Sequence, residues 1–446
     1  MQIIAPYIHH IECLAHELAT AKDLTSKRQE VEAALNGELS RTLRELVPLE
    51  ELHASGAFFT SESMADKLLD GITNEEIASL VALDPSCGGG NLLLAFARRL
   101  PLATTLRQTL TIWGRQLQGI DIHEEFARAT RVRLALLAAH RGMATYGLGF
   151  LQGSLPNLEE VFRHIGPGDG LEQPWPSAGL LLLNPPFNSV AVPAKYKWTT
   201  GKISQAALFT LEGLGHAQPG TLLRAILPDV LRSGSRYRRW REIVSEQAAI
   251  DGIQVLGQFD SKTQVDVFLL TLRITGAKQS ASSTWVIPAK AEVNSEVIGN
   301  LFDVKVGRVV PYRDKEIGEN YPYLDVKHVP AWGNIVPGAA RRCFTGNTFP
   351  TPFVIVRRTS KATDSRRAVA TVVDCSVPGI SEQVAVENHL LVLCPKSGDV
   401  LDCHQLLTVL RDSRTNNWLN EQIRCRHLTV GAVASIPYWS ESEAVR

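Results

Sequence analysis

The sequence predicts an α/β fold in which helices cover a mostly parallel sheet, and the pattern between Leu80 and Arg273 is the main reason. Short apolar runs alternate there with longer stretches whose apolar residues recur every three or four positions. Such runs are typical of strands buried on both faces, and their alternation with helices is typical of parallel sheets. The predicted strands are "LVALDPS", "LQGIDI", "GLLLLNPP", "LLRAILP", "IDGIQVLGQF" and "QVDVFLLTLR".

The remainder of the 446-residue chain predicts parts on either side of this domain. Residues 1–50 contain amphipathic stretches that predict N-terminal helices. Small and polar residues dilute the pattern over 279–300, which we interpret as a linker. Residues 301–446 combine β-rich segments with a late helix, as in an α+β domain. We therefore expect a main domain over 51–278 and a second domain over 301–446.

Charge and cysteine content exclude several classes of protein. Basic and acidic residues number 46 each, so no overall charge points to a nucleic-acid or membrane partner. The seven cysteines form no CxxC pair, which argues against a zinc site and against a secreted disulfide framework, and we expect no metal. No apolar run approaches about 18 residues and no signal peptide is evident. We therefore expect a cytoplasmic protein with no membrane partner.

Two of the predicted strands end at carboxylates, and one of these is followed by a glycine-rich turn. In "LDPSCGGGN", Asp84 precedes Gly88, Gly89 and Gly90, which would let a ligand approach the backbone at the start of a helix. Asp121 ends the next strand, where a carboxylate can accept hydrogen bonds from both hydroxyls of a ribose. A structural turn and a helix N-cap are the alternative interpretations. Together the two features predict a Rossmann-like site for a nucleoside-containing cofactor.

A third strand ends in "NPPF", which combines an amide, two rigid residues and an aromatic ring. The side-chain carbonyl of Asn184 and the backbone carbonyl of Pro185 could together hold an exocyclic amine. Pro186 stiffens the turn, and Phe187 could stack on the ring that carries the amine. A turn that only ends a buried strand is the alternative. The pattern therefore predicts a binding site for an aromatic ring with an amino group.

Taken in order, "GAFFTSE", "LDPSCGGG", "GIDI" and "LLLNPPF" resemble the motifs of gamma-class adenine-N6 DNA methyltransferases. The resemblance extends from about Ser55 to Lys278. It implies a class I methyltransferase fold, S-adenosyl-L-methionine as the cofactor, and a target adenine that is flipped out of the DNA duplex. It also implies a type II restriction-modification enzyme whose residues 301–446 form a DNA target-recognition domain. In this family the amine attacks the methyl group directly, without a metal.

The resemblance implies roles for single residues. Thr60 would lie near the methionine end of the cofactor, and Ile122 would pack against its adenine. Ser154 replaces the aspartate that usually contacts the adenine amino group, and Phe259 would cover the second face of the flipped base. The implied cofactor-binding residues are Thr60, Asp84, Pro85, Cys87, Gly88, Gly90, Asp121, Ile122 and Ser154. The implied catalytic residues are Asn184, Pro185, Pro186 and Phe187.

Double-stranded DNA is the implied partner, and two arginine-rich segments fit it. Arginines can neutralise phosphates, although a solvated surface is the alternative for each segment. The first segment contains Arg232, Arg236, Arg238, Arg239 and Arg241, of which Arg236, Arg238 and Arg239 are the predicted substrate-binding residues. The second contains Arg341, Arg342, Arg357, Arg358, Lys361, Arg366 and Arg367.

These observations favour a DNA adenine-N6 methyltransferase of a restriction-modification or other host-defence system, with a separate restriction or defence subunit as a further partner. Two alternatives stay open. An NPPF tip would also serve a methyltransferase that acts on RNA or on glutamine in proteins, although the basic C-terminal part favours DNA. The serine at position 154 would suit a catalytically inactive methyltransferase-like subunit that only binds DNA.

Overall fold

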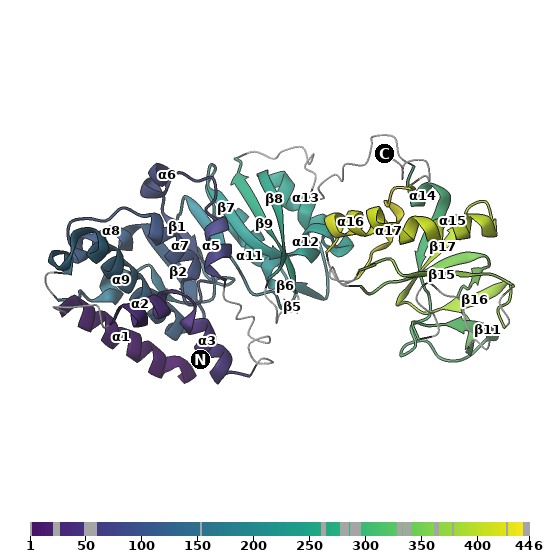
Figure 1. Cartoon of the computed structure of the whole chain (residues 1–446), viewed down its shortest axis with the longest axis horizontal. Helices are drawn as coiled ribbons and strands as arrows, with labels where there is room; N and C mark the ends of the chain where they lie inside the picture. Colours follow the sequence, from purple (N-terminus) through teal and green to yellow (C-terminus); the bar gives the residue numbers. More distant parts are fainter. Residues whose placement is uncertain are drawn as a thin grey trace. The chain divides into compact units, whose positions relative to one another are not determined.

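The chain forms two compact units in the computed structural model (Figure 1). The first unit contains Met1–Pro228, Arg239–Leu256 and Val267–Ser283, and the second contains Asp229–Arg238, Gly257–Asp266 and Thr284–Arg446. Two short segments of the predicted main domain therefore belong to the second unit, and most of the predicted linker lies outside the described residues. The structure describes residues 2–20, 27–48, 60–151, 154–259, 265–276, 285, 296–327, 332, 340–360, 365–376, 379–424 and 427–439.

A seven-stranded sheet of order β3-β2-β1-β4-β7-β9-β8 forms the centre of the first unit. Its first five strands in this order pair in parallel, whereas β9 pairs antiparallel with β7. The predicted Rossmann-like, mostly parallel sheet is therefore confirmed. The strands are β1 (Ala82–Asp84), β2 (Leu117–Asp121), β3 (Ile165–Pro167), β4 (Leu180–Leu183), β7 (Leu222–Pro228), β8 (Ala248–Gln258) and β9 (Asp266–Ile274).

The strand order reverses between β1 and β4, and this reversal positions a crevice. From β1 the chain proceeds outward to β2 and β3, then returns to place β4 on the other side of β1. Connections on the two sides of such a point diverge, so ligands bind at the carboxyl ends of the two strands. β1 and β4 are buried along their whole length, which their uninterrupted apolar sequences predicted.

Helices connect these strands, and local signals define where they begin. α8 begins where the Thr105 side chain accepts a hydrogen bond from the Gln108 N–H (3.3 Å), which satisfies a free donor of the first turn.

Among the described residues, no helix has both the length and the apolar character needed to cross a membrane. The helices are α5 (Glu62–Lys67), α6 (Asn74–Ser79), α7 (Asn91–Arg99), α8 (Leu106–Gln116), α9 (Glu124–Tyr146), η2 (Leu148–Leu151), α10 (Leu158–Val161), α11 (Gln205–His216), α12 (Asp229–Ser233), η3 (Ser235–Tyr237) and α13 (Arg238–Gln247).

The N-terminal helices pack on α9, as the amphipathic pattern of residues 1–50 predicted. Ile8 of α1 and Leu39 and Leu43 of α3 share one apolar cluster with Phe126 and Ala129 of α9. The three- and four-residue spacing within each helix places these side chains on one face. The elements are η1 (Gln2–Ile4), α1 (Ala5–Thr20), α2 (Arg28–Leu35) and α3 (Glu38–Leu46).

The second unit is β-rich, as predicted, and contains two four-stranded sheets of order β10-β17-β14-β15 and β12-β11-β16-β13. Side chains alternate along β14, so that Val354 and Val356 pack in a cluster with Leu406 of α15, while Ile355 packs in another with Leu324 of β11. Residues 353–356 of this strand are therefore all apolar despite its antiparallel pairing. The strands are β10 (Phe302–Val306), β11 (Glu319–Leu324), β12 (Arg341–Phe344), β13 (Phe349–Pro350), β14 (Phe353–Arg357), β15 (Ala370–Val373), β16 (Gln383–Val386) and β17 (Leu390–Pro395).

The late helix predicted for the second domain is two helices. Asp412 ends α15 with an extended backbone and accepts a hydrogen bond from the Arg414 N–H (2.7 Å), so it also caps α16. An aspartate at such a position favours a new helix start over a continuous helix. The helices are α14 (Ile298–Leu301), α15 (Val400–Arg411), α16 (Ser413–Gln422) and α17 (Val430–Ala434).

Candidate active site

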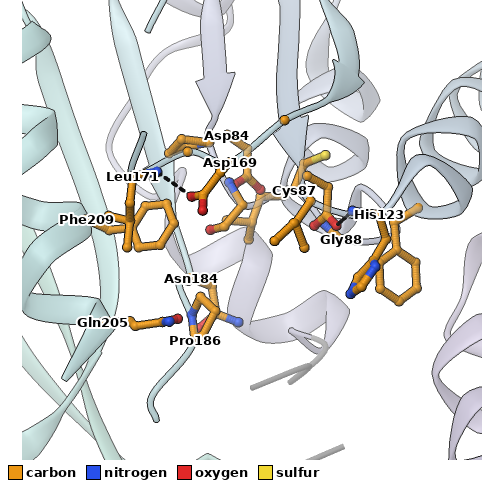
Figure 2. A pocket seen from close by; sticks show the side chains of 18 of the residues that line it. Asp84, Cys87, Gly88, His123, Asp169, Leu171, Asn184, Pro186, Gln205 and Phe209 are labelled. Carbon is orange, nitrogen blue, oxygen red and sulfur yellow. Dashed lines mark hydrogen bonds between the residues drawn. The ribbon is translucent and has the colours of Figure 1, made fainter. Parts of the chain in front are cut away.

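A cavity lies at the carboxyl ends of β1, β2 and β4, where the strand order reverses (Figure 2). Its wall includes the turn after β1, the tips of β2 and β4, the loop after β3 and the start of α11. Of the residues predicted from the sequence, the cavity brings together Thr60, Asp84, Pro85, Cys87, Gly88, Asp121, Ile122, Asn184 and Pro186.

The glycine turn shapes the first wall. Gly88 and Gly90 have φ angles of 50° and 83°, a region that favours glycine. A Cβ at Gly90 would lie 2.6 Å from the Thr130 side chain, so this glycine is also required by packing against α9. Gly88 lines the cavity, whereas Gly90 lies behind it as the N-cap of α7. The turn thus places backbone next to the space where a ligand would bind.

Asp121 joins the tip of β2 to this turn. Its two carboxylate oxygens accept hydrogen bonds from the backbone N–H groups of Gly88 and His123, each at 2.9 Å. Burial raises the pKa of this carboxyl above its ordinary value. A carboxylate has about four lone-pair sites, so both oxygens can still accept from a ligand. The neighbouring Ile122 is 66% exposed and lines the cavity, so its apolar side chain is available to a ligand.

Asp84 is the most deeply buried carboxylate of the cavity, with 2% of its surface exposed. Burial raises its pKa to about 8, against the opposing effect of a hydrogen bond from the Ser86 N–H (3.1 Å). The Ser86 hydroxyl is also buried in this wall and has no hydrogen-bond partner among the residues that the structure describes. Uncompensated burial of this kind is typical of sites that a ligand completes.

Asn184 at the tip of β4 is held by a chain of hydrogen bonds. Its amide nitrogen donates to the Thr60 hydroxyl (2.7 Å), and the Asn91 amide donates to the Thr60 carbonyl (2.6 Å). Arg133, buried in α9, donates in turn to the Asn91 side-chain oxygen (2.8 Å) and to two carbonyls at the end of α2. Because the amide nitrogen faces Thr60, the side-chain carbonyl is the part of Asn184 that can accept from a ligand.

Ser154, which the resemblance implies at the contact with the adenine amino group, does not lie in the cavity wall. Ser154 is exposed in a loop before α10, and it is not among the described residues that line the cavity. The third strand is β3, Ile165–Pro167, and it is followed by Asp169, which does line the cavity. The Gly168 N–H donates to the Asp121 carbonyl (2.8 Å), which fixes this loop beside the tip of β2.

Other predicted residues lie outside the cavity wall. Pro185 is buried, and Phe187 is half-buried and accepts a hydrogen bond at its carbonyl from the Ser204 hydroxyl (3.4 Å). Phe259 is buried and belongs to the second unit. Sequence reasoning missed Gln205 and Phe209, which line the cavity from the first turns of α11 (Figure 2). Their four-residue spacing at the start of the first helix after the NPPF tip is the signal that could have identified them.

The first arginine-rich segment is only partly a surface. Arg232, predicted to face phosphate, is fully buried and pairs with Asp229 at 2.7 Å. Arg239 is exposed but pairs with two glutamates of α13. Arg236 and Arg238 are exposed, as a contact with DNA requires. Spacing alone could not separate these positions, because α12, η3 and α13 turn the chain between them.

The second basic segment is also partly buried, so not all of its predicted phosphate contacts are possible. Arg367 is 1% exposed and donates to the carbonyls of Leu419 (3.0 Å) and Ile423. Arg342 is 9% exposed and donates to one carboxylate and one carbonyl. Lys361 lies outside the described residues. The remaining arginines are half-buried or exposed, namely Arg341, Arg357, Arg358 and Arg366.

Among solved structures, the chain is similar to the type IIL restriction-modification enzyme MmeI in complex with DNA. The identity is 12%, the TM-score is 0.55, and the match covers 89% of this chain and 69% of MmeI. The chain is also similar to the type IIG restriction endonuclease BpuSI, at 14% identity and a TM-score of 0.42, over 91% of this chain and 61% of that protein. No family model and no curated protein matches the sequence. The likeness to MmeI shows a shared fold.

Proposed function

We propose that this chain is an S-adenosylmethionine-dependent DNA methyltransferase that modifies the N6 amine of a flipped-out adenine, within a restriction-modification or other host-defence system. The observation that carries the proposal is that Asn184 lines the same cavity as the glycine turn and Asp121. An amine acceptor and a nucleoside site thus share one crevice. The order of the motifs in the sequence and the fold shared with MmeI support this function.

The residues of the cavity fit S-adenosylmethionine. Asp121 would accept hydrogen bonds from the ribose hydroxyls, and the exposed Ile122 would cover one face of the adenine ring. Asp169, in the loop after β3, would accept from the adenine amino group. The buried hydroxyl of Ser86 would gain a partner, and the buried carboxyl of Asp84 would offset the positive charges of the methionine end.

The chemistry follows from how Asn184 is held. The cofactor supplies an electrophilic methyl group on a positively charged sulfur. Asn184 would accept a hydrogen bond from the target amine, which orients the amine and favours a lone pair directed at the methyl group. Thr60 fixes this acceptor, because the amide nitrogen of Asn184 donates to the Thr60 hydroxyl at 2.7 Å. The proton released from the nitrogen would leave to solvent, without a nucleophilic side chain.

In this proposal the second unit would supply the contacts with the DNA backbone and with the recognition sequence, and the first unit would bind the flipped base. The exposed Arg236 and Arg238 would contact phosphates, and residues 301–446 would supply a target-recognition domain. An inactive subunit that only binds DNA would be favoured by a serine in place of the aspartate that contacts adenine. Asp169, which lines the cavity after β3, would supply a carboxylate for that contact, and this favours the active enzyme over the alternative.

The first test replaces the acceptor. Asn184→Ala should reduce methyl transfer to DNA about 100- to 1000-fold, because electrostatic stabilisation of the transition state is lost, while affinity for S-adenosylmethionine stays close to normal. Transfer of a labelled methyl group measures the rate, and long-read sequencing of DNA from expressing cells identifies the modified base and its context. Asn36→Ala, at an exposed asparagine of the same unit, is the control. Near-normal transfer by Asn184→Ala would refute the proposed role.

A further inference from the structure

A β-hairpin follows the NPPF tip directly and takes no part in the chemistry proposed above. β5 (Ser189–Ala191) pairs antiparallel with β6 (Lys202–Ser204), and the loop between them extends the hairpin (Figure 1). At its base, the Gln205 N–H donates to the Asn188 carbonyl (2.9 Å). The hairpin therefore begins next to the NPPF element and ends at Gln205, which lines the cavity. Anything bound by the hairpin would lie beside the target base.

The composition of this hairpin is one-sided. Between Asn188 and Ser204 there are three lysines, Lys195, Lys197 and Lys202, and no acidic residue, in a chain whose overall charge is zero. Lys197 and Lys202 are exposed, and neither has an ion-pair partner among the residues that the structure describes. The local positive charge is thus available to an anionic partner.

The hairpin is anchored on α11 rather than loose. Tyr196 donates a hydrogen bond to Glu212 of α11, and Lys195 forms an ion pair with the same carboxylate. Burial and this hydrogen bond raise the pKa of Tyr196 above its ordinary range, so its hydroxyl remains a donor. One lysine is therefore used for anchoring, while Lys197 and Lys202 are exposed on the same anchored hairpin.

Trp198 adds a second indication that the hairpin binds something. Its indole N–H is buried and has no hydrogen-bond partner among the described residues. A buried donor without an acceptor is unfavourable, and a bound ligand can supply the acceptor. The hairpin also interleaves aromatic residues with lysines in "KYKW", a combination suited to backbone and base contacts with nucleic acid.

We propose that the hairpin Asn188–Ser204 binds phosphates of the DNA strand that carries the target base, through Lys197 and Lys202. This inference rests on the proposed function. The two lysines would hold the DNA backbone next to the extruded nucleotide. The contacts of the hairpin with Glu212 would keep these lysines at a constant distance from Asn184. Backbone contacts of this kind position a substrate without reading its sequence.

The test is the salt dependence of DNA affinity. Each phosphate contact contributes about −0.9 to the slope of log affinity against log salt, so Lys197→Gln with Lys202→Gln should reduce the slope by about 1.8. Fluorescence anisotropy with a short mixed-sequence duplex measures it in the full-length protein. Lys67→Gln, an exposed lysine of the same unit, should leave the slope unchanged. Affinity for S-adenosylmethionine should not change in either variant, because none of these lysines lines the cavity.

The results separate this proposal from the proposed function. If the wild-type protein methylates DNA but the double variant keeps the full slope, the role of the hairpin is overturned and the enzymatic function stands. If no DNA is methylated but the slope falls as expected, the hairpin proposal stands and the function fails. The same anisotropy measurement on single-stranded RNA tests the partner. If the double variant loses salt dependence for RNA but keeps it for the DNA duplex, the assignment of DNA as the partner is overturned.

Discussion

Two kinds of buried polar side chain, a carboxylate in the first unit and an arginine in the second, serve different purposes. In the first unit, Asp84 and Thr60 are buried at the end of β1 and before α5, where they line a cavity. In the second unit, Arg367 is equally buried but donates to the carbonyls of Leu419 and Ile423 at the end of α16. The last carbonyls of a helix have no partner within it, so a buried arginine there completes the helix.

The difference teaches how to interpret a polar residue within an apolar pattern. A carboxylate that ends a parallel strand lies at the sheet edge where ligands bind, so its place along the chain already indicates a function. An arginine in a β-rich segment has no such fixed place. Its long side chain can reach a phosphate or a carbonyl of its own chain, and only the tertiary packing decides which.

The largest effect expected from this comparison is on stability. Arg367→Met should destabilise the second unit by about 3 kcal/mol, because two carbonyls lose a charged donor in a buried place. Scanning calorimetry measures the unfolding of this unit, and cofactor affinity of the first unit should be unchanged. The adjacent Arg366→Met removes the same charge from an exposed position and should have little effect on stability.

An effect of Arg367→Met on DNA binding instead of stability would remove the contrast between the buried arginine and the cavity residues. If Arg367→Met unfolds like the wild type but weakens DNA binding as much as Arg366→Met does, then Arg367 contacts phosphate after all. Its buried position would then describe only the free protein.

Much of the cavity could be predicted from the sequence because its parts follow strong strands. Asp84, Asp121 and Asn184 each end an apolar run, and such a run identifies both the strand and its tip. Asp169 follows a three-residue strand in which Ile165 alone is buried, so no apolar run in the sequence indicates this strand or its tip. The placement of residues on neighbouring helices depends on tertiary packing, which a pattern along the chain does not encode.

A smaller effect sharpens the comparison within the first unit, between Asp169 and Ser154 as candidates for the contact with the adenine amino group. Asp169→Asn should weaken affinity for S-adenosylmethionine about tenfold, since a carboxylate accepts from an amino group more strongly than an amide oxygen does. Ser154→Ala should leave the affinity unchanged, because this side chain is exposed outside the cavity. Isothermal titration calorimetry of both variants decides the matter, and a larger loss for Ser154→Ala would assign the adenine contact to Ser154 instead.

The smallest effect concerns the protonation of Asp84. Its pKa of about 8 means that the carboxyl is mostly protonated near neutral pH. A positively charged cofactor favours the ionised form, so affinity for S-adenosylmethionine should rise with pH and level off above about 8, by at most about tenfold per pH unit. Asp84→Asn should flatten this profile. A wild-type profile that is already flat would show that Asp84 does not face the positive end of the cofactor.

The pH dependence of folding stability gives an independent measure of the protonation of Asp84. Stability should fall with rising pH, whereas cofactor affinity should rise. The pKa of Asp84 is higher in the folded state than its ordinary value of about 4, so the folded state holds the proton more tightly. Stability of the free protein is therefore lost as pH rises from about 4 to about 8. Asp84→Asn removes this loss, and the variant should melt at a higher temperature than the wild type near pH 8, with the difference fading toward pH 4. A difference that grows at low pH instead would mean that Asp84 is ionised in the folded protein, in the manner of an ordinary surface carboxylate.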